Sequence, residues 1–526
     1  MALKFFHFFL LISLSLNVCL SQACDPEILN WYNKKSPGMN TEKAYKKVSS
    51  KKSKTVIVAV IDSGIDIEHE DLKGKIWTNP KEIPNNKIDD DKNGYIDDIH
   101  GWNFLGGSDG KHQQYACLEK TRIYRDYRDK YEKIEPNQVS NSELKEYELY
   151  KLLRKEVREE KEQYEQILSQ IDMLPMIIKM VPDMVSNAIG KKNYTKKDLE
   201  KWKPTDEQMS QIKDLALAIE NGELSDEAIK EQKDQVYAMV NYHYNVNYND
   251  REIVGDNPKD FSQKNYGNND VEGPDALHGT HVGGIIASIR GNNIGNDGVA
   301  SDVLLMSLRA VPDGDEQDKD IAFAIRYAVD NGAQIINMSF GKQYSPNAKE
   351  VYEALKYADS KGVLLVHAAG NENKNIDENE KYPTAKYTFQ NEKFVHYLSI
   401  GANTRFSKNT LAASFSNFGK VSVDVFAPGH DIFSTVPQSA YKKLNGTSMA
   451  APMVSGAAAF LKSYYSELTM MEIKDILIAS AKNYSTNKCE KPGTKELVDF
   501  GTLSVSGSVI DLNTAVSLAE KKIKSK

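Results

Sequence analysis

The stretch TVIVAVIDSG, residues 55–64, gives the clearest indication of the fold of this chain. Its first seven residues are all β-branched except Ala59, and no polar residue alternates with apolar ones after Thr55. Such an unbroken run predicts a strand that is buried on both faces, as in a parallel sheet. The run ends at Asp62, and open α/β sheets bind their ligands at the C-terminal ends of their strands.

A second informative stretch is NGTSMAAP, residues 445–452, which places a serine where a turn becomes a helix. Gly446 permits a tight bend, and Pro452 suits a first helical turn because its missing N–H is not needed there. The positive end of a helix favours an oxyanion, so Ser448 is a candidate nucleophile. An ordinary helix N-cap is the alternative.

A serine nucleophile needs a base, and the base needs an acid that orients it. The candidate base is His278, in LHGTHVGGIIA, residues 277–287, which is typical of an apolar helix. The candidate acid is Asp62. The order Asp, His, Ser along the chain is one of three known for this triad.

The segments around Asp62, His278 and Ser448 resemble the signature blocks of the subtilisin-like serine proteases. Two further segments of the chain match this pattern in the same order: IINMSFG, residues 335–341, and VLLVHAAGN, residues 363–371. The resemblance covers roughly residues 55–105 and 270–520. It implies an α/β fold with a mostly parallel central sheet and helices on both faces.

The resemblance also implies a reaction, acyl transfer from a peptide to water, that needs no catalytic cofactor. Asn371 matches the side-chain donor to the oxyanion in that family. Five residues match the segments that bind substrate: Ser339, Phe340, Gly341, Ala369 and Gly370.

The stretch DDDKNGYIDD, residues 89–98, predicts a structural Ca²⁺ site. Its alternating oxygen ligands and its glycine are similar to those of a calcium loop, with candidate ligands Asp89, Asp91, Asn93 and Asp97. His100 stands where an EF-hand has its bidentate glutamate, so this is not an EF-hand. The alternative is a cluster of turns whose side chains cap their own backbone. By the family resemblance, Asp71 is a further candidate ligand.

The bulk properties are those of an exported enzyme. The net charge of −7 and the isoelectric point near 5.9 give no reason to expect a nucleic acid as a partner. Residues 1–23 resemble a secretory signal peptide, and Cys24 would then be the first residue and a candidate lipid anchor. No later segment is long and apolar enough to span a bilayer. We therefore expect a monomeric protein that is secreted, periplasmic or an outer-surface lipoprotein, with protein or peptide substrates.

The expected organisation is an N-terminal extension (24–54) followed by a peptidase domain (55–525). Between Asp62 and His278, residues 115–265 predict a large helical insertion, rich in charged residues with apolar positions at helical spacing. It is either a solvated appendage or a lid or docking arm over the cleft.

Two rival functions remain open from the sequence. A metal-dependent hydrolase would use His278 and His281, but these are three residues apart without the glutamate of a zinc-protease helix. His281 is better explained as a packed core histidine. The other rival is a catalytically inactive binding protein; such relatives typically lack a triad residue, whereas this chain has all three.

Overall fold

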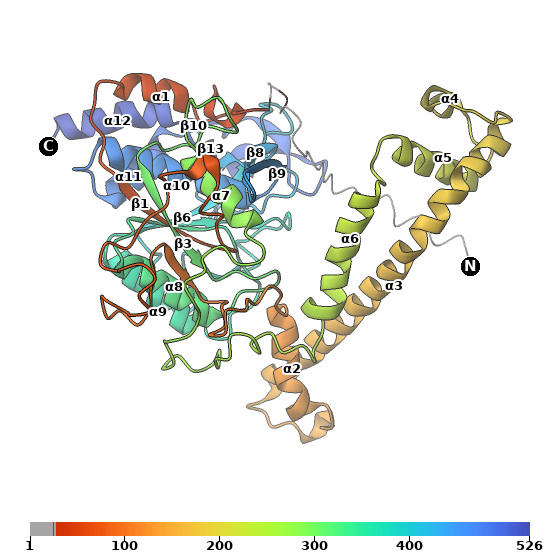
Figure 1. Ribbon diagram of the computed structural model, residues 1–526, viewed down its shortest axis with the longest axis horizontal. Helices are drawn as coiled ribbons and strands as arrows, with labels where there is room; N and C mark the ends of the chain where they lie inside the picture. The colour runs from red at the N-terminus through yellow and green to blue at the C-terminus, as the bar shows by residue number, and fades with distance from the viewer. Residues whose placement is uncertain (1–24, 26–27) are drawn as a thin grey trace. The chain divides into compact units, whose positions relative to one another are not determined.

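A nine-stranded sheet forms the centre of the larger of two structural units (Figure 1). The computed structural model describes residue 25 and residues 28–526. All neighbouring strands are parallel except the pair β10–β13 at one edge. In order across the sheet the strands are β10 (Lys482–Asn483), β13 (Ser508–Val509), β7 (Val425–Pro428), β6 (Tyr397–Asn403), β5 (Leu364–Ala368), β4 (Ile335–Met338), β1 (Val56–Asp62), β3 (Val303–Arg309) and β2 (Gly101–Asn103). The predicted mostly parallel α/β fold is confirmed.

Strand β1 is buried on both faces, as its composition predicts. Val58 and Val60 belong to one apolar core, whereas Ala59 and Ile61 belong to the core on the opposite face. Successive side chains of a strand point to opposite faces, so only a run that is apolar at every position can fill both cores.

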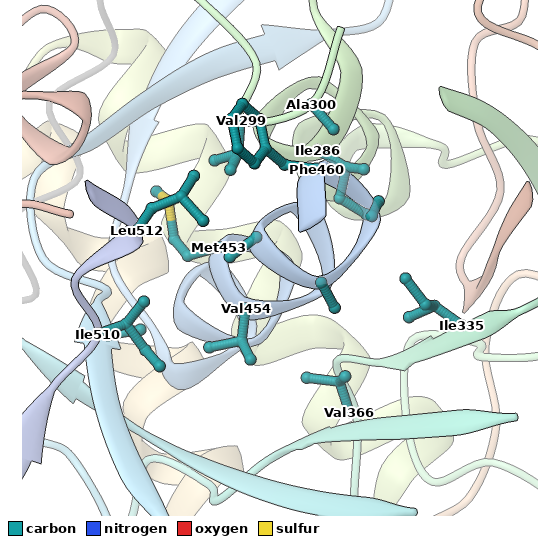
Figure 2. Packing of buried hydrophobic residues seen from close by; sticks show 14 of the residues in the cluster. Ile286, Val299, Ala300, Ile335, Val366, Met453, Val454, Phe460, Ile510 and Leu512 are labelled. Atoms are coloured by element: carbon teal, nitrogen blue, oxygen red, sulfur yellow. The ribbon is translucent and has the colours of Figure 1, made fainter. Parts of the chain in front are cut away.

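Helices cover both faces of the sheet (Figure 1). The core on one face includes residues of α1 (Thr41–Val48), α7 (Leu277–Ala287), α10 (Thr447–Tyr464), α11 (Met470–Ser480) and α12 (Leu512–Lys524). The core on the other face includes residues of α8 (Asp318–Asp330) and α9 (Ala348–Ser360). Figure 2 shows Val454 of α10 on the side of the helix that faces Val366 of the sheet, in the same core as Ile335.

A hairpin of β8 (Ile432–Val436) and β9 (Ala440–Leu444) holds α7 in place. Ser434 Oγ and Thr435 Oγ1 donate hydrogen bonds to main-chain carbonyls of α7, at 2.9 and 2.8 Å. The approach is close, because a Cβ on Gly284 would lie 2.0 Å from Thr435 Oγ1. A second hairpin joins β11 (Lys488–Glu490) and β12 (Leu497–Asp499).

The other unit, residues 120–248 in the described part of the chain, is helical. It contains α3 (Leu144–Ile189), α4 (Lys196–Lys201), α5 (Glu207–Glu220), α6 (Asp226–Ala238) and most of α2 (Glu119–Tyr131). Two small apolar clusters join α3 to α4 and α5, and α3 to α6. We call residues 120–248 the helical unit; it lies inside the range 115–265 expected for the insertion.

The features expected at the N-terminus, the predicted signal peptide (1–23) and Cys24, fall outside the described residues. Within them, no helix combines the length and hydropathy needed to cross a membrane. Cys117 and Cys489 are both buried and are not joined in a disulfide.

Candidate active site

Asp62 is held rigidly at the C-terminal end of β1. Its main-chain carbonyl accepts hydrogen bonds from the N–H groups of Ala310 and Val311, at 3.0 and 3.2 Å. Its carboxylate is buried, and Oδ1 accepts the Ser63 N–H at 2.8 Å. The same Oδ1 lies 2.6 Å from His278 Nδ1, which fixes one tautomer of the imidazole through this contact.

Two glycines allow His278 to come this close. A Cβ on Gly279 would lie 2.1 Å from the carbonyl oxygen of Gly64, and a Cβ on Gly64 would lie 2.1 Å from that of Glu272. Gly64 also has φ +117°, a conformation that other residues rarely adopt. Both positions therefore require glycine if α7 is to start beside the end of β1.

The charge of Asp62 affects the pKa of the His278 imidazole. Burial is the largest single influence and lowers the pKa of the imidazole, but the charge and hydrogen bond of Asp62, with a smaller effect of Asp275, outweigh it. The pKa of His278 is therefore raised. The side chain is still 37% exposed, so an external molecule can reach it.

Ser448 lies in the first turn of α10 and is hydrogen-bonded to Ser339, the residue that follows β4. Its Oγ donates to the Ser339 carbonyl at 3.0 Å, and Ser339 Oγ donates to the Ser448 carbonyl at 2.9 Å. Strands β1 and β4 are neighbours, with Ile61 paired to Met338, so Asp62 and Ser339 follow in register. Ser448 and the Asp62–His278 pair therefore lie at the same end of the sheet, where the strands have their C-termini.

Asn371 is oriented by Thr447, a residue that the sequence analysis did not select. Thr447 N–H and Oγ1 donate to Asn371 Oδ1 at 2.8 and 3.0 Å, which leaves Nδ2 directed elsewhere. A Cβ on Gly446 would lie 3.5 Å from both Asn371 Nδ2 and the Ser448 main-chain N. Both nitrogens therefore lie beside Gly446. No local signal marks Thr447, since a threonine at a helix start is common.

The segment Ser339–Gly341 and the residue after it are hydrogen-bonded along one side. The carbonyl of Phe340 accepts His367 Nε2–H at 2.8 Å, and the main chain of Lys342 pairs with Tyr382 through two 2.9 Å hydrogen bonds. Neighbouring residues of an extended chain present their main-chain groups to opposite sides. Gly341 therefore presents its N–H and carbonyl to the side away from Tyr382.

Ala369 and Gly370 directly follow β5, and Gly370 contacts the start of α10. Ala369 is buried, and its carbonyl accepts Asn417 Nδ2–H at 2.9 Å. Gly370 N–H donates to Thr447 Oγ1 at 3.0 Å. Gly370 has φ +102°, and a Cβ there would lie 2.4 Å from Asn417 Nδ2, so the position requires glycine.

His281, the second histidine of α7, is a packed core residue. It is fully buried, and its Nε2 lies 3.2 and 3.0 Å from the carbonyl oxygens of Ile432 and Lys442. Burial lowers its pKa to about 3, so the ring is neutral. This geometry favours a role in holding the β8–β9 hairpin against α7 and offers nothing to the metal-hydrolase hypothesis.

The carboxylate of Glu82, which no motif predicts as a ligand, lies near those of Asp89 and Asp91. Glu82, Asp89 and Asp91 each offer one oxygen, and these oxygens lie within 4.8 Å of one another. Glu82 is 7% exposed; its Oε1 accepts the Asp91 N–H at 3.0 Å, whereas its buried Oε2 has no hydrogen-bond partner. Glu82 lies seven residues before Asp89, outside the repeating pattern, so no spacing rule points to it.

The other candidate ligands have different surroundings. Asp97 accepts N–H groups of Asn86 and Lys87 on its two carboxylate oxygens, at 3.2 and 2.8 Å. Asn93 Oδ1 accepts the Tyr95 N–H at 2.8 Å. Neither residue belongs to the three-carboxylate group. Asp71 is buried at a separate place, where burial raises its pKa and Asn292 Nδ2 donates to Oδ1 at 2.7 Å.

Comparison with known proteins shows the family of the chain. The model of the subtilase family matches residues 53–501, which is most of the chain. The chain therefore belongs to the subtilase family, whose class of enzyme is the serine-type endopeptidase.

Individual relatives are similar to parts of the chain. Subtilisin-like protease 2 of Plasmodium falciparum (isolate 3D7) is 38% identical over 220 residues, 40% of this chain and 16% of that protein. The thermophilic serine proteinase of Bacillus sp. (strain AK1) is 39% identical over 187 residues, 35% of this chain and 42% of that protein. Subtilisin DY of Bacillus licheniformis is 35% identical over 207 residues, 39% of this chain and 70% of that protein. The chain thus spans less than half the length of the first two relatives.

Proposed function

We propose that this protein hydrolyses peptide bonds through a triad of Asp62, His278 and Ser448. One observation supports the proposal. Asp62 and Ser339 follow the neighbouring strands β1 and β4 in register, and Ser448 is hydrogen-bonded to Ser339. Ser448 therefore lies at the C-terminal end of the same strands as the Asp62–His278 pair, in which Oδ1 and Nδ1 are 2.6 Å apart. A nucleophile, a base and an acid that orients the base are the three parts that acyl transfer requires. The substrates we propose are proteins or peptides.

In this mechanism the Ser448 hydroxyl turns from the Ser339 carbonyl toward His278 Nε2. The imidazole accepts the hydroxyl proton while Oγ attacks the peptide carbonyl, and Nδ1–H remains bonded to Asp62. The imidazolium then gives the proton to the leaving amine, and water hydrolyses the acyl-enzyme. The raised pKa of His278 supports the role of Asp62, because the carboxylate stabilises the charged ring.

The negative charge that develops on the carbonyl oxygen of the substrate would lie at a position beside Gly446. Asn371 Nδ2 and the Ser448 N–H flank that position, and Thr447 holds the Asn371 amide so that its nitrogen is available. Donors that are already oriented stabilise an oxyanion without reorganising during the reaction.

The substrate would bind as an added strand on the side of Gly341 away from Tyr382. Main-chain hydrogen bonds give such binding its affinity with little dependence on side chains. Ala369 and Gly370, beside the start of α10, would form one wall of the pocket for the side chain next to the cleaved bond.

We further propose that Glu82, Asp89 and Asp91 hold a structural Ca²⁺. Three carboxylates in one place repel one another, and a buried carboxylate oxygen without a hydrogen bond is costly unless a cation compensates it. The unpartnered Oε2 of Glu82 supports this set over the one predicted from sequence. Asp71 is a candidate for a second site. Bound calcium would stiffen the loop and take no part in the chemistry.

We also propose that the protein is exported and acts as a monomer outside the cytoplasm. The support for export is the signal-like segment at residues 1–23, followed by Cys24 as the candidate lipid anchor.

The decisive experiment replaces Ser448 by alanine. Ser448→Ala should abolish peptide hydrolysis and covalent labelling by an organophosphonate, while the melting curve stays close to that of the wild type. Ser466→Ala, just beyond the end of α10, is the matched control and should keep both. Near-normal turnover by Ser448→Ala would refute the triad.

A further inference from the structure

Lys342 directly follows the proposed substrate-binding segment, and its side chain is buried. The side chain is 2% exposed. Its Nζ lies 2.6 Å from Glu119 Oε2, 2.9 Å from Asp318 Oδ1 and 2.7 Å from the carbonyl oxygen of Glu316. A buried ammonium group is stable only when it is paired and hydrogen-bonded. These three acceptors therefore hold the Lys342 side chain in one place.

Glu119 fixes the other end of this ion pair. It is the first residue of α2, and the residue after it begins the helical unit. Its N–H donates to Asp315 Oδ2 at 2.7 Å. Just before it, Ala116 N–H donates to the Asp313 carbonyl at 2.8 Å. Glu119 is thus anchored on the chain that leads into α8, although it opens a helix of the other unit.

The Glu119–Lys342 pair accordingly connects two places that are 223 residues apart in sequence. At one end lies Glu119, directly before the first residue of the helical unit, a place that we call the root of that unit. At the other end, Lys342 pairs with Tyr382 through its main chain, and this pairing sets the direction in which Gly341 presents its N–H and carbonyl.

We infer that Glu119 and Lys342 are positioning residues: their buried ion pair holds the segment Ser339–Gly341 in the geometry that pairs with an extended substrate, and links that geometry to the root of the helical unit. The inference rests on the proposed function, because it concerns how the same site binds peptides. Without the Glu119 charge, Lys342 keeps Asp318 and the Glu316 carbonyl, and its ammonium moves toward them. The Gly341 main chain then loses its fixed position.

The test is Glu119→Gln in the full chain, with two substrates. One is a peptide extended by four residues on the N-terminal side of the cleaved bond, so that it reaches Gly341; the other is a short ester that does not. We expect KM for the extended peptide to rise by about 5-fold or more, a typical coupling effect, with kcat nearly unchanged. KM for the ester and the rate of labelling by a small organophosphonate should stay at wild-type values.

Asp256→Asn is the matched control. It also removes a buried carboxylate charge, but that carboxylate pairs with Lys319 at 2.7 Å and with Arg251. It should lower the melting temperature without a selective change in KM. Should Glu119→Gln fold poorly, Glu119→Asp keeps the charge on a shorter side chain, and we expect an intermediate rise in KM for the extended peptide only.

Two results would overturn the inference. One is an equal change for both substrates; the other is the same selective change in Asp256→Asn. If the proposed function is wrong, the result differs: the wild-type chain neither cleaves peptides nor reacts with the phosphonate. The positioning role would then be refuted as well.

Discussion

His278 Nδ1 lies 2.6 Å from Asp62 Oδ1, and this contact joins the start of α7 to the end of β1 across 216 residues of sequence. The carboxylate is buried while the imidazole is partly exposed. The charge of Asp62 therefore acts on His278 from the protein interior, and part of the imidazole remains accessible from outside.

This contact predicts how activity depends on pH. The pKa of His278 is raised above its ordinary value of 6.5, so the protonated ring, which cannot accept a proton, persists to higher pH. We expect kcat/KM to rise with pH through a midpoint above 6.5. Asp62→Asn should move this midpoint down and lower kcat by roughly 10⁴-fold, since the asparagine favours the wrong tautomer.

Asp275→Asn is the control for this profile. Asp275 makes the smallest of the contributions that raise the pKa of His278. Its replacement should lower the midpoint only slightly and leave kcat almost unchanged. A profile of kcat/KM that is flat between pH 5 and 9 would contradict His278 as the base.

Asn371→Ala tests the oxyanion position beside Gly446. We expect kcat to fall by about 10²–10³-fold, the range known for such a donor in subtilisin, with little change in KM. Asn379→Ala, exposed in the following loop, should have no effect. An effect of Asn371→Ala mainly on KM would mean that this residue binds the substrate rather than the transition state.

Calcium binding should stabilise the folded state. If Glu82, Asp89 and Asp91 hold Ca²⁺, added calcium should raise the melting temperature by mass action on the native state. Glu82→Gln should remove most of that shift. Asp97→Asn should keep it, because Asp97 accepts main-chain N–H groups of Asn86 and Lys87 instead. Equal melting curves with calcium and with chelator would show that the loop is a turn cluster.

Trimming the helical unit tests whether it selects substrates. Arg125 Nη1 donates to the Tyr248 carbonyl at 2.9 Å, so the two ends of the unit are adjacent and a short linker can replace residues 125–245. We expect this deletion to change the turnover of folded protein substrates more than that of short peptides. If a well-folded variant changes both by the same factor, the unit is a solvated appendage.

Elements with a local signal could be predicted from the sequence. The apolar run of β1 and the small-residue pattern of α7 report burial along neighbouring residues, and the structure has the strand at Val56–Asp62 and the helix at Leu277–Ala287. The family resemblance then predicted the α/β class, because its motifs occur in a fixed order at the ends of such elements. The catalytic assignments of Asp62, His278, Ser448 and Asn371 stay predictions.

Contacts between side chains that are distant in sequence depend on how the chain folds in three dimensions. Glu82 joins Asp89 and Asp91, Thr447 orients Asn371, and Glu119 pairs with Lys342. None of these contacts follows from spacing along the chain. Each depends on how loops and helix ends are carried together by the strand order of the sheet, and a side chain at a loop has no periodic pattern that reveals its partner.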